Sequence, residues 1–143
     1  MTRKTCYLAL IAAVACFVLL PGCPKQEATT TIEPKSSESK SASGNIIVTA
    51  PQPDAEISSP VTLKGRARVF EAAMNARVVS EDGKELGKAD FMASEGAPEF
   101  GEFEAKISFA KPPGVDKGFV EVFDHSAKDD SVIDLVRIPV KFK

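Results

Sequence analysis

The stretch VTLKGRARV, residues 61–69, decides the fold of this chain. Apolar or small residues stand at its odd-numbered positions, from Val61 to Val69, and every residue between them is Thr, Lys or Arg. Successive side chains of a β-strand point to opposite faces. A period of two therefore predicts a strand with one buried face and one basic, solvated face.

The same alternation returns on both sides of this stretch. It predicts further strands at 46–49, 74–80, 85–92, 103–109, 118–124 and 136–142. Asp82-Gly83 is a hairpin signal between two of them, and loops are predicted at 51–60, 94–98, 111–117 and 127–130. No stretch of 12 residues has a helical stripe, so about seven strands in an all-β sandwich are expected. Pro139 lacks an amide N–H, which predicts an edge or a bulge there.

The N-terminal segment has the pattern of an export signal. Arg3 and Lys4 precede an apolar run over residues 7–20, and Leu20-Pro21-Gly22-Cys23 follows. This order is typical of a secretory signal peptide, and its end resembles the bacterial lipobox, which implies a lipid on Cys23. A transmembrane anchor is the alternative, but the run falls short of the roughly 20 residues that span a bilayer. A cleaved signal without lipid is the other alternative.

Three segments follow from this interpretation. We expect a lipoprotein signal peptide at 1–22, the lipidated Cys23 with a flexible linker at 23–44, and an antiparallel sandwich domain at 45–143. The linker is polar, and as a flexible coil it would span about 25 Å. The lipid would hold the protein on the cell membrane or the outer membrane, on the extracytoplasmic side. Cys6 and Cys16 leave with the signal, so no disulfide is expected.

Charge and residue inventory exclude several classes of function. Residues 45–143 contain thirteen Lys and Arg against seventeen Asp and Glu, a net charge of −4. An acidic domain is a poor match for nucleic acid. The only histidine, His125, precedes Ser126, but adjacent strand residues point to opposite faces, and one histidine cannot make a zinc site of the usual kind. The sequence therefore predicts no enzyme, no cofactor and no metal of that type.

Several segments resemble, in the same order, a known family. They are Pro51-Gln52-Pro53, Ser59-Pro60-Val61, the run from Gly65 to Ala72, Asp82-Gly83, and the run from Val122 to Asp129. Together they resemble the immunoglobulin-like domain of bacterial spore-germination proteins, the Gmad type, over about residues 45–143. The resemblance implies an immunoglobulin-like sandwich on an exported, often lipid-anchored protein without enzymatic activity.

Three groups of residues are candidates for specific roles. Phe119, Glu121 and Phe123 lie on the face opposite Val120 and Val122, which predicts a binding face, or else a patch packed under a loop. Calcium is the second candidate, because loop carboxylates suit this ion; the residues are Asp54, Asp124, Asp129 and Asp130. The alternative is that Asp in turns bonds its own backbone. Phe70 and Glu71 are predicted to be structural, with Glu71 buried and organising a corner between strands.

The sequence thus leaves two functions open. The leading one is a lipid-anchored, non-enzymatic module of the cell envelope, linked to spore germination by resemblance, that binds an envelope protein or a wall polymer. The alternative is a calcium-dependent adhesion or stability module at the cell surface.

Overall fold

The computed structural model describes residues 37–143. The predicted signal peptide, Cys23 and most of the predicted linker therefore lie outside the described residues. Nine strands lie within the described part: β1 (Ser39–Lys40), β2 (Ile46–Ala50), β3 (Ala55–Ile57), β4 (Val61–Ala67), β5 (Ala73–Ser80), β6 (Glu85–Met92), β7 (Gly101–Ile107), β8 (Lys117–His125) and β9 (Val132–Phe142). One short 3₁₀ turn, η1 (Phe70–Ala72), joins β4 to β5. No helix in residues 37–143 is long and apolar enough to span a membrane.

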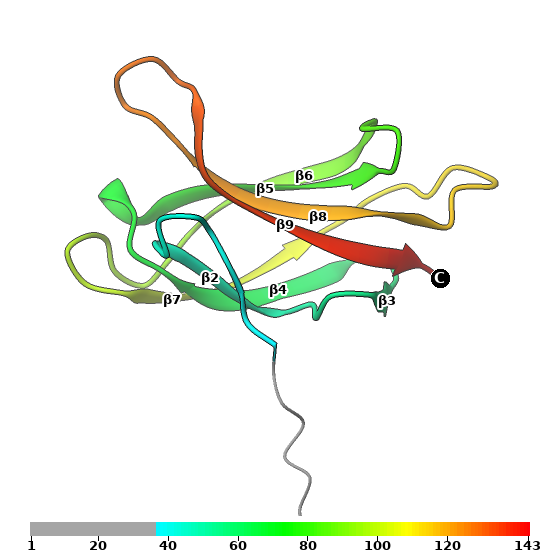
Figure 1. Cartoon of the computed structure of the whole chain (residues 1–143), viewed down its shortest axis with the longest axis horizontal. Helices are drawn as coiled ribbons and strands as arrows, with labels where there is room; N and C mark the ends of the chain where they lie inside the picture. The colour runs from blue at the N-terminus through cyan, green and yellow to red at the C-terminus, as the bar shows by residue number, and fades with distance from the viewer. Residues whose placement is uncertain (1–36) are drawn as a thin grey trace, which may run out of the picture. The chain divides into compact units, whose positions relative to one another are not determined.

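The strands form two sheets that face each other (Figure 1). The four-stranded sheet has the order β1-β2-β4-β7, and the five-stranded sheet has the order β3-β9-β8-β5-β6. All neighbours are antiparallel except β3 and β9, which run parallel. The predicted all-β sandwich is thereby confirmed.

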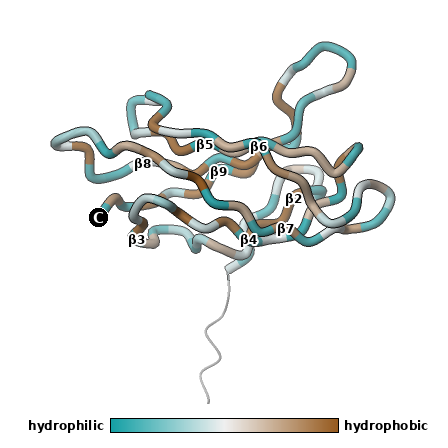
Figure 2. The backbone as a smooth tube through the Cα atoms, turned by 180° about the vertical axis from the view of Figure 1, so that it is seen from behind, coloured by the Kyte–Doolittle hydropathy of each residue, from teal (hydrophilic) through white to brown (hydrophobic). Residues whose placement is uncertain are grey.

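The core fills the space between the sheets with the predicted apolar stripes. Residues of every second position on β4, β5, β8 and β9 are buried, among them Leu63, Val78, Val120 and Ile138. Along the strands in Figure 2, apolar and polar residues alternate. Gly65 belongs to the inward stripe of β4, and a Cβ there would lie 2.7 Å from Cζ of Phe103. The missing side chain is what allows this ring to pack over the strand.

The structure corrects the sequence prediction at two short strands. β3 lies inside the predicted loop 51–60 and pairs with the end of β9, from Ala55 opposite Val140 to Ile57 opposite Phe142. β1 lies inside the predicted linker and pairs with Ile47 and Val48. Two residues that the prediction assigned to the linker, Ser39 and Lys40, are therefore paired with the sandwich. A strand of two or three residues is too short to show an alternation of apolar and polar residues in the sequence. Its pairing depends instead on the free edge of a strand far away in the chain.

No strand pairs with β9 at Pro139 on the side away from β8, so this position is an edge, as predicted. It stands opposite Phe119 of β8, and its carbonyl oxygen accepts the amide of Asp54 at 2.8 Å. The N and C=O of one strand residue point to the same side, so the proline nitrogen also faces away from β8. On that side β3 joins only from Val140 onward. The missing N–H consequently removes no hydrogen bond between strands.

Candidate binding site on the five-stranded sheet

A row of charged side chains crosses four strands of the five-stranded sheet. Lys88 of β6 stands opposite Arg77 of β5, Arg77 opposite Glu121 of β8, and Glu121 opposite Arg137 of β9. Directly opposite residues of antiparallel strands share a face. These four residues alternate with the buried stripes of their strands, so they lie together on the outer face. We call them the arginine row.

Glu121 is the centre of the arginine row and is only 4% exposed. Arg77 donates a hydrogen bond from Nε to Oε2 at 2.6 Å, and Nε of Arg137 forms an ion pair with Oε1 at 3.2 Å. A buried carboxylate must be paired to remain charged at acceptable cost. Here each oxygen has its own guanidinium. Both pairs use Nε, and within residues 37–143 the terminal amino groups of the two half-exposed arginines make no hydrogen bond.

Two aromatic rings support the arginines. The guanidinium carbon of Arg137 lies 3.9 Å from the ring centre of Phe119, and that of Arg77 lies 5.2 Å from the ring centre of Phe123. A cation over an aromatic face is attracted by the ring quadrupole. Phe123 is only 6% exposed. Phe119, Glu121 and Phe123 therefore do share one outer face, but the arginines lie over the rings, so it is not an open aromatic patch.

Lys88 gives the row an excess of positive charge. Among the described residues it makes no ion pair, and it stands directly opposite Arg77. Like charges in this position destabilise a sheet. The row itself holds three cations and one carboxylate, and two further carboxylates, Glu85 and Asp90, lie beside Lys88 on β6.

A shallow pocket of about 190 Å³ lies beside Arg77 and Lys88. Its other lining residues are Asn75, Ala76, Glu85, Asp90, Phe123, His125 and Val132. Asp90 accepts a hydrogen bond from the side-chain amide of Asn75 at 2.7 Å. The pocket therefore has two carboxylates, Glu85 and Asp90, on the side of β6, next to the cations of the row.

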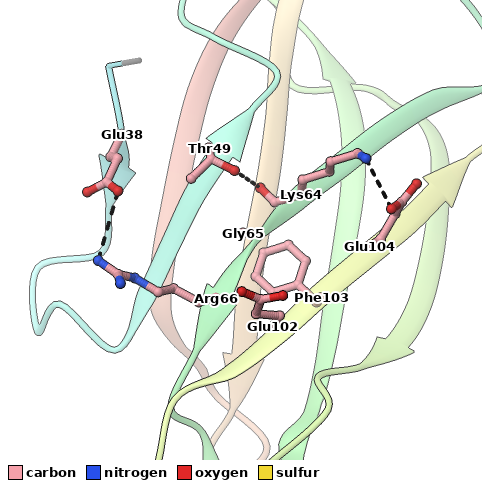
Figure 3. Close-up of a pocket in the computed structure, with 8 residues that line it drawn as sticks. All are labelled: Glu38, Thr49, Lys64, Gly65, Arg66, Glu102, Phe103 and Glu104. Carbon is pink, nitrogen blue, oxygen red and sulfur yellow. Dashed lines mark hydrogen bonds and ion pairs between the residues drawn. The ribbon is translucent and has the colours of Figure 1, made fainter. Parts of the chain in front are cut away.

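The outer face of the four-stranded sheet carries a larger but charge-paired depression (Figure 3). Its volume is about 480 Å³. Lys64 pairs with Glu104 at 3.1 Å, and Arg66 lies 3.9 Å from Glu38. Arg66 also stands opposite Glu102 in the register. The two cations thus face three carboxylates, which leaves no unbalanced positive charge in this depression.

The structure does not bring the four candidate calcium residues together. Asp54 lies beside Pro139, toward the end of β9, whereas Asp124, Asp129 and Asp130 lie at the hairpin before β9 begins. Val132 and Pro139 are seven positions apart along β9, which separates the two places by about 23 Å. Within residues 37–143, no group of three or more His, Cys, Asp or Glu side chains is arranged to hold a metal ion.

The hairpin carboxylates bond their own surroundings. Asp124 accepts the amide of His125 at 2.7 Å, and Asp129 accepts the hydroxyl of Ser131 at 2.7 Å. The hydroxyl of Ser131 lowers the pKa of Asp129, with the hydroxyl of Ser126 acting in the same direction, whereas burial raises the pKa of Asp124. Nδ1 of His125 lies 3.4 Å from a carboxylate oxygen of Asp130. The backbone carbonyl oxygen of Asp130 is closer, 3.0 Å from Nδ1, so the partner of His125 is Asp130 and not the neighbouring Ser126.

The corner at Phe70 and Glu71 differs from the prediction. Phe70 is 69% exposed, and Glu71 is exposed with φ 56° and ψ 13°. Ala72 also has a positive φ, 59°, and is buried. Two successive residues in the left-handed region reverse the chain within one turn. Glu71 thus shapes the corner through its backbone conformation, and the prediction of a buried carboxylate is wrong.

Sequence reasoning missed three of the four residues of the arginine row. Arg77, Lys88 and Arg137 are outward positions of alternating strands, where charged residues are ordinary. The one signal in the sequence was Glu121 between two phenylalanines on a nominal outer face.

Comparison with known proteins identifies the domain. The family model of the immunoglobulin-like domain of bacterial spore germination matches residues 45–131. This range extends from β2 to the hairpin before β9. The match ends earlier than the predicted 143. No curated protein and no solved structure matches the chain significantly. With more than half of its residues matched, the chain belongs to the family of the immunoglobulin-like domain of bacterial spore germination.

Proposed function

We propose that this protein is a lipid-anchored, non-enzymatic binding module of the bacterial cell envelope. Membership of the family supports a role related to spore germination. The order of basic residues, apolar run and Leu20-Pro21-Gly22-Cys23 supports the anchor. The residue inventory supports a role without catalysis, because residues 45–143 contain a single histidine and no cysteine.

The arginine row is the observation that carries the binding function. Its side chains sit on regular strands, and Glu121 and the two rings hold the arginines in place. Groups that are already ordered lose less conformational entropy when a partner binds. A sheet face that presents fixed hydrogen-bond donors is suited to contact a partner, and we place the contact there.

Site-specific photocrosslinking in intact cells tests this placement. A photoreactive phenylalanine analogue at Leu135 would lie two positions from Arg137 on β9, and one at Met92 would lie on the outer face of β6. Both positions are exposed. Lys106, on the outer face of β7 in the other sheet, is the matched control. We expect crosslinks to an envelope component from Leu135 and Met92 but not from Lys106. Crosslinks from Lys106 alone would contradict the placement.

A further inference from the structure

We infer that two copies of this chain pair along the free edge of β6 and form a symmetric dimer. The two β6 strands run antiparallel across a two-fold axis at Ala89, so the five-stranded sheets of both copies join into one continuous sheet. A two-fold dimer uses the same surface on both copies, so this surface must be complementary to itself. The inference goes beyond the proposed binding function and does not depend on it.

The outer edge of β6 carries unpaired backbone groups. β6 is the last strand of its sheet, with β5 as its neighbour on one side. The amide of Ala93 donates to the carbonyl oxygen of Ala72 at 2.9 Å. Because hydrogen-bonded positions alternate along a strand, the odd-numbered residues from Gly87 to Ala93 face β5 and the even-numbered ones face away from it. Within residues 37–143, no backbone hydrogen bond is made on that outer side by Lys88, Asp90 or Met92.

The open part of this edge has a defined start. The carbonyl oxygen of Leu86 also faces away from β5, but it accepts the amide of Ala110 at 3.1 Å. The connection after β7 therefore closes the beginning of β6 and leaves residues 88–92 accessible. An exposed strand edge of this kind accepts a further strand through main-chain hydrogen bonds.

Other edges of the two sheets are less suited to pairing. On β7, Ser94 closes the position of Glu102, because its amide and its hydroxyl bond the carbonyl oxygen and the amide of Glu102. On β9, the stretch not covered by β3 ends at Pro139, which has no N–H to donate. β1 and β3 contain only two and three residues.

Charge selects the register of the β6 pair. An antiparallel pair centred on Ala89 places Lys88 of each copy opposite Asp90 of the other. Both residues point their backbone groups outward, so each such pair exchanges two N–H···O bonds. Opposite charges in directly opposing positions stabilise a sheet. The two neighbouring registers would instead place Lys88 opposite Lys88 or Asp90 opposite Asp90, which is destabilising.

The same two side chains have unused capacity in the single copy. Lys88 makes no ion pair among the described residues and stands opposite the like charge of Arg77. Asp90 accepts one hydrogen bond, from the side-chain amide of Asn75 to Oδ1 at 2.7 Å. Both side chains are exposed on the outer face of the edge strand. Charges on an edge ordinarily prevent pairing, but this order of charges, Lys-Ala-Asp, attracts a second antiparallel copy.

A cysteine at the two-fold axis tests the pairing. Ala89 would meet Ala89 of the second copy as a pair without hydrogen bonds, with Cα atoms about 4.5 Å apart. That separation lies within the disulfide range of about 4.4–6.8 Å. When cells that express full-length Ala89→Cys are treated with a mild oxidant, we expect a covalent dimer on a non-reducing gel. Ala105→Cys, the same change at an inward position of β7, and the wild type are the controls and should remain monomeric.

Charge variants in the Ala89→Cys background test the register. Lys88→Glu makes both edge charges negative, and Asp90→Lys makes both positive. Each variant alone should lower the yield of the covalent dimer about tenfold, because two attractive pairs become repulsive. Coexpression of the two variants, one of them enlarged by a C-terminal tag, should restore a covalent dimer between them. This restored dimer would also show that neither variant has lost its fold.

Three outcomes would overturn the inference. They are a dimer yield for Ala89→Cys no higher than that for Ala105→Cys, a yield that does not change in the two charge variants, and a mixed pair that stays monomeric. The photocrosslink from Leu135 tests the proposed function separately, because Leu135 lies on β9 and not on the paired edge. Either result can therefore fail while the other stands.

Discussion

Glu121 shows how one buried charge organises a surface. Its carboxylate is nearly inaccessible, and each oxygen is bound by a different arginine from a neighbouring strand. A buried ion pair adds little net stability compared with well-packed apolar residues of similar size. Removing only the positive or only the negative partner is strongly destabilising, because it leaves a buried charge unpaired. The side chain therefore fixes the positions of Arg77 and Arg137 and makes the fold depend on them.

We expect Arg77→Gln combined with Arg137→Gln to lower the free energy of unfolding by about 3–5 kcal/mol, because Glu121 is left buried without a cation. Adding Glu121→Gln removes that isolated charge. The triple variant should be more stable than the double variant by about 1–3 kcal/mol. Urea unfolding followed by circular dichroism measures the free energy of unfolding of the wild type, the double variant and the triple variant. A triple variant no more stable than the double variant would show that burial of the charge is not the cause.

The β8–β9 hairpin is the element that projects furthest beyond the sheets (Figure 1). Its base is tied to the turn before β2, because Asp134 accepts hydrogen bonds from Ser43 and, at 3.0 Å, from Asn45. Its tip is held by the short-range bonds of Asp124 and Asp129. The carboxylates of this loop thus bond backbone and hydroxyl groups nearby.

These two carboxylates should respond to pH in opposite ways. The lowered pKa of Asp129 lies below its ordinary value of 3.8, so its contribution to stability is present above pH 3.8 and is lost as pH falls through the lower value. The raised pKa of Asp124 makes its charged form unfavourable, so its contribution is lost as pH rises above 3.8.

An NMR titration of two amides checks this prediction. The Ser131 amide should titrate below pH 3.8 and the His125 amide above it, since each amide donates to one of the carboxylates. Ser131→Ala should move the Asp129 titration upward, because the hydroxyl is the main cause of the shift. A single common midpoint for both amides would contradict the assignment.

At the scale of the whole molecule, the two outer faces have different chemistry and different neighbours. The described chain begins at Ser37, whose amide donates to Gln52, beside the four-stranded sheet. That sheet carries the charge-paired depression, whereas the arginine row lies on the outer face of the other sheet. If the domain is anchored through its N-terminal segment, which approaches beside the four-stranded sheet, the proposed binding face lies on the other, five-stranded sheet.

The proposed anchor predicts a lipid on Cys23. Cells grown with an alkyne fatty acid should yield a tagged wild-type protein and an untagged Cys23→Ser variant, because the other two cysteines, Cys6 and Cys16, would leave with the predicted signal. The tag is detected by click chemistry on the purified protein. Equal tagging of both proteins would contradict the anchor. Cys16→Ser is the control that should keep the tag.

The sequence alone determined the fold class and most strands, because alternation of apolar and polar residues is a local property that a strand carries with it. The stripe from Val61 to Val69, the Asp82-Gly83 turn and the edge position of Pro139 belong to this group. The tertiary structure alone decided β3, which pairs with residues 85 positions later, and the arginine row. Arg77 and Glu121 are 44 residues apart, and their contact depends on the order and register of strands. No local pattern of the sequence specifies which strands are neighbours or how they are aligned. The arginine row could therefore be identified only from the tertiary structure.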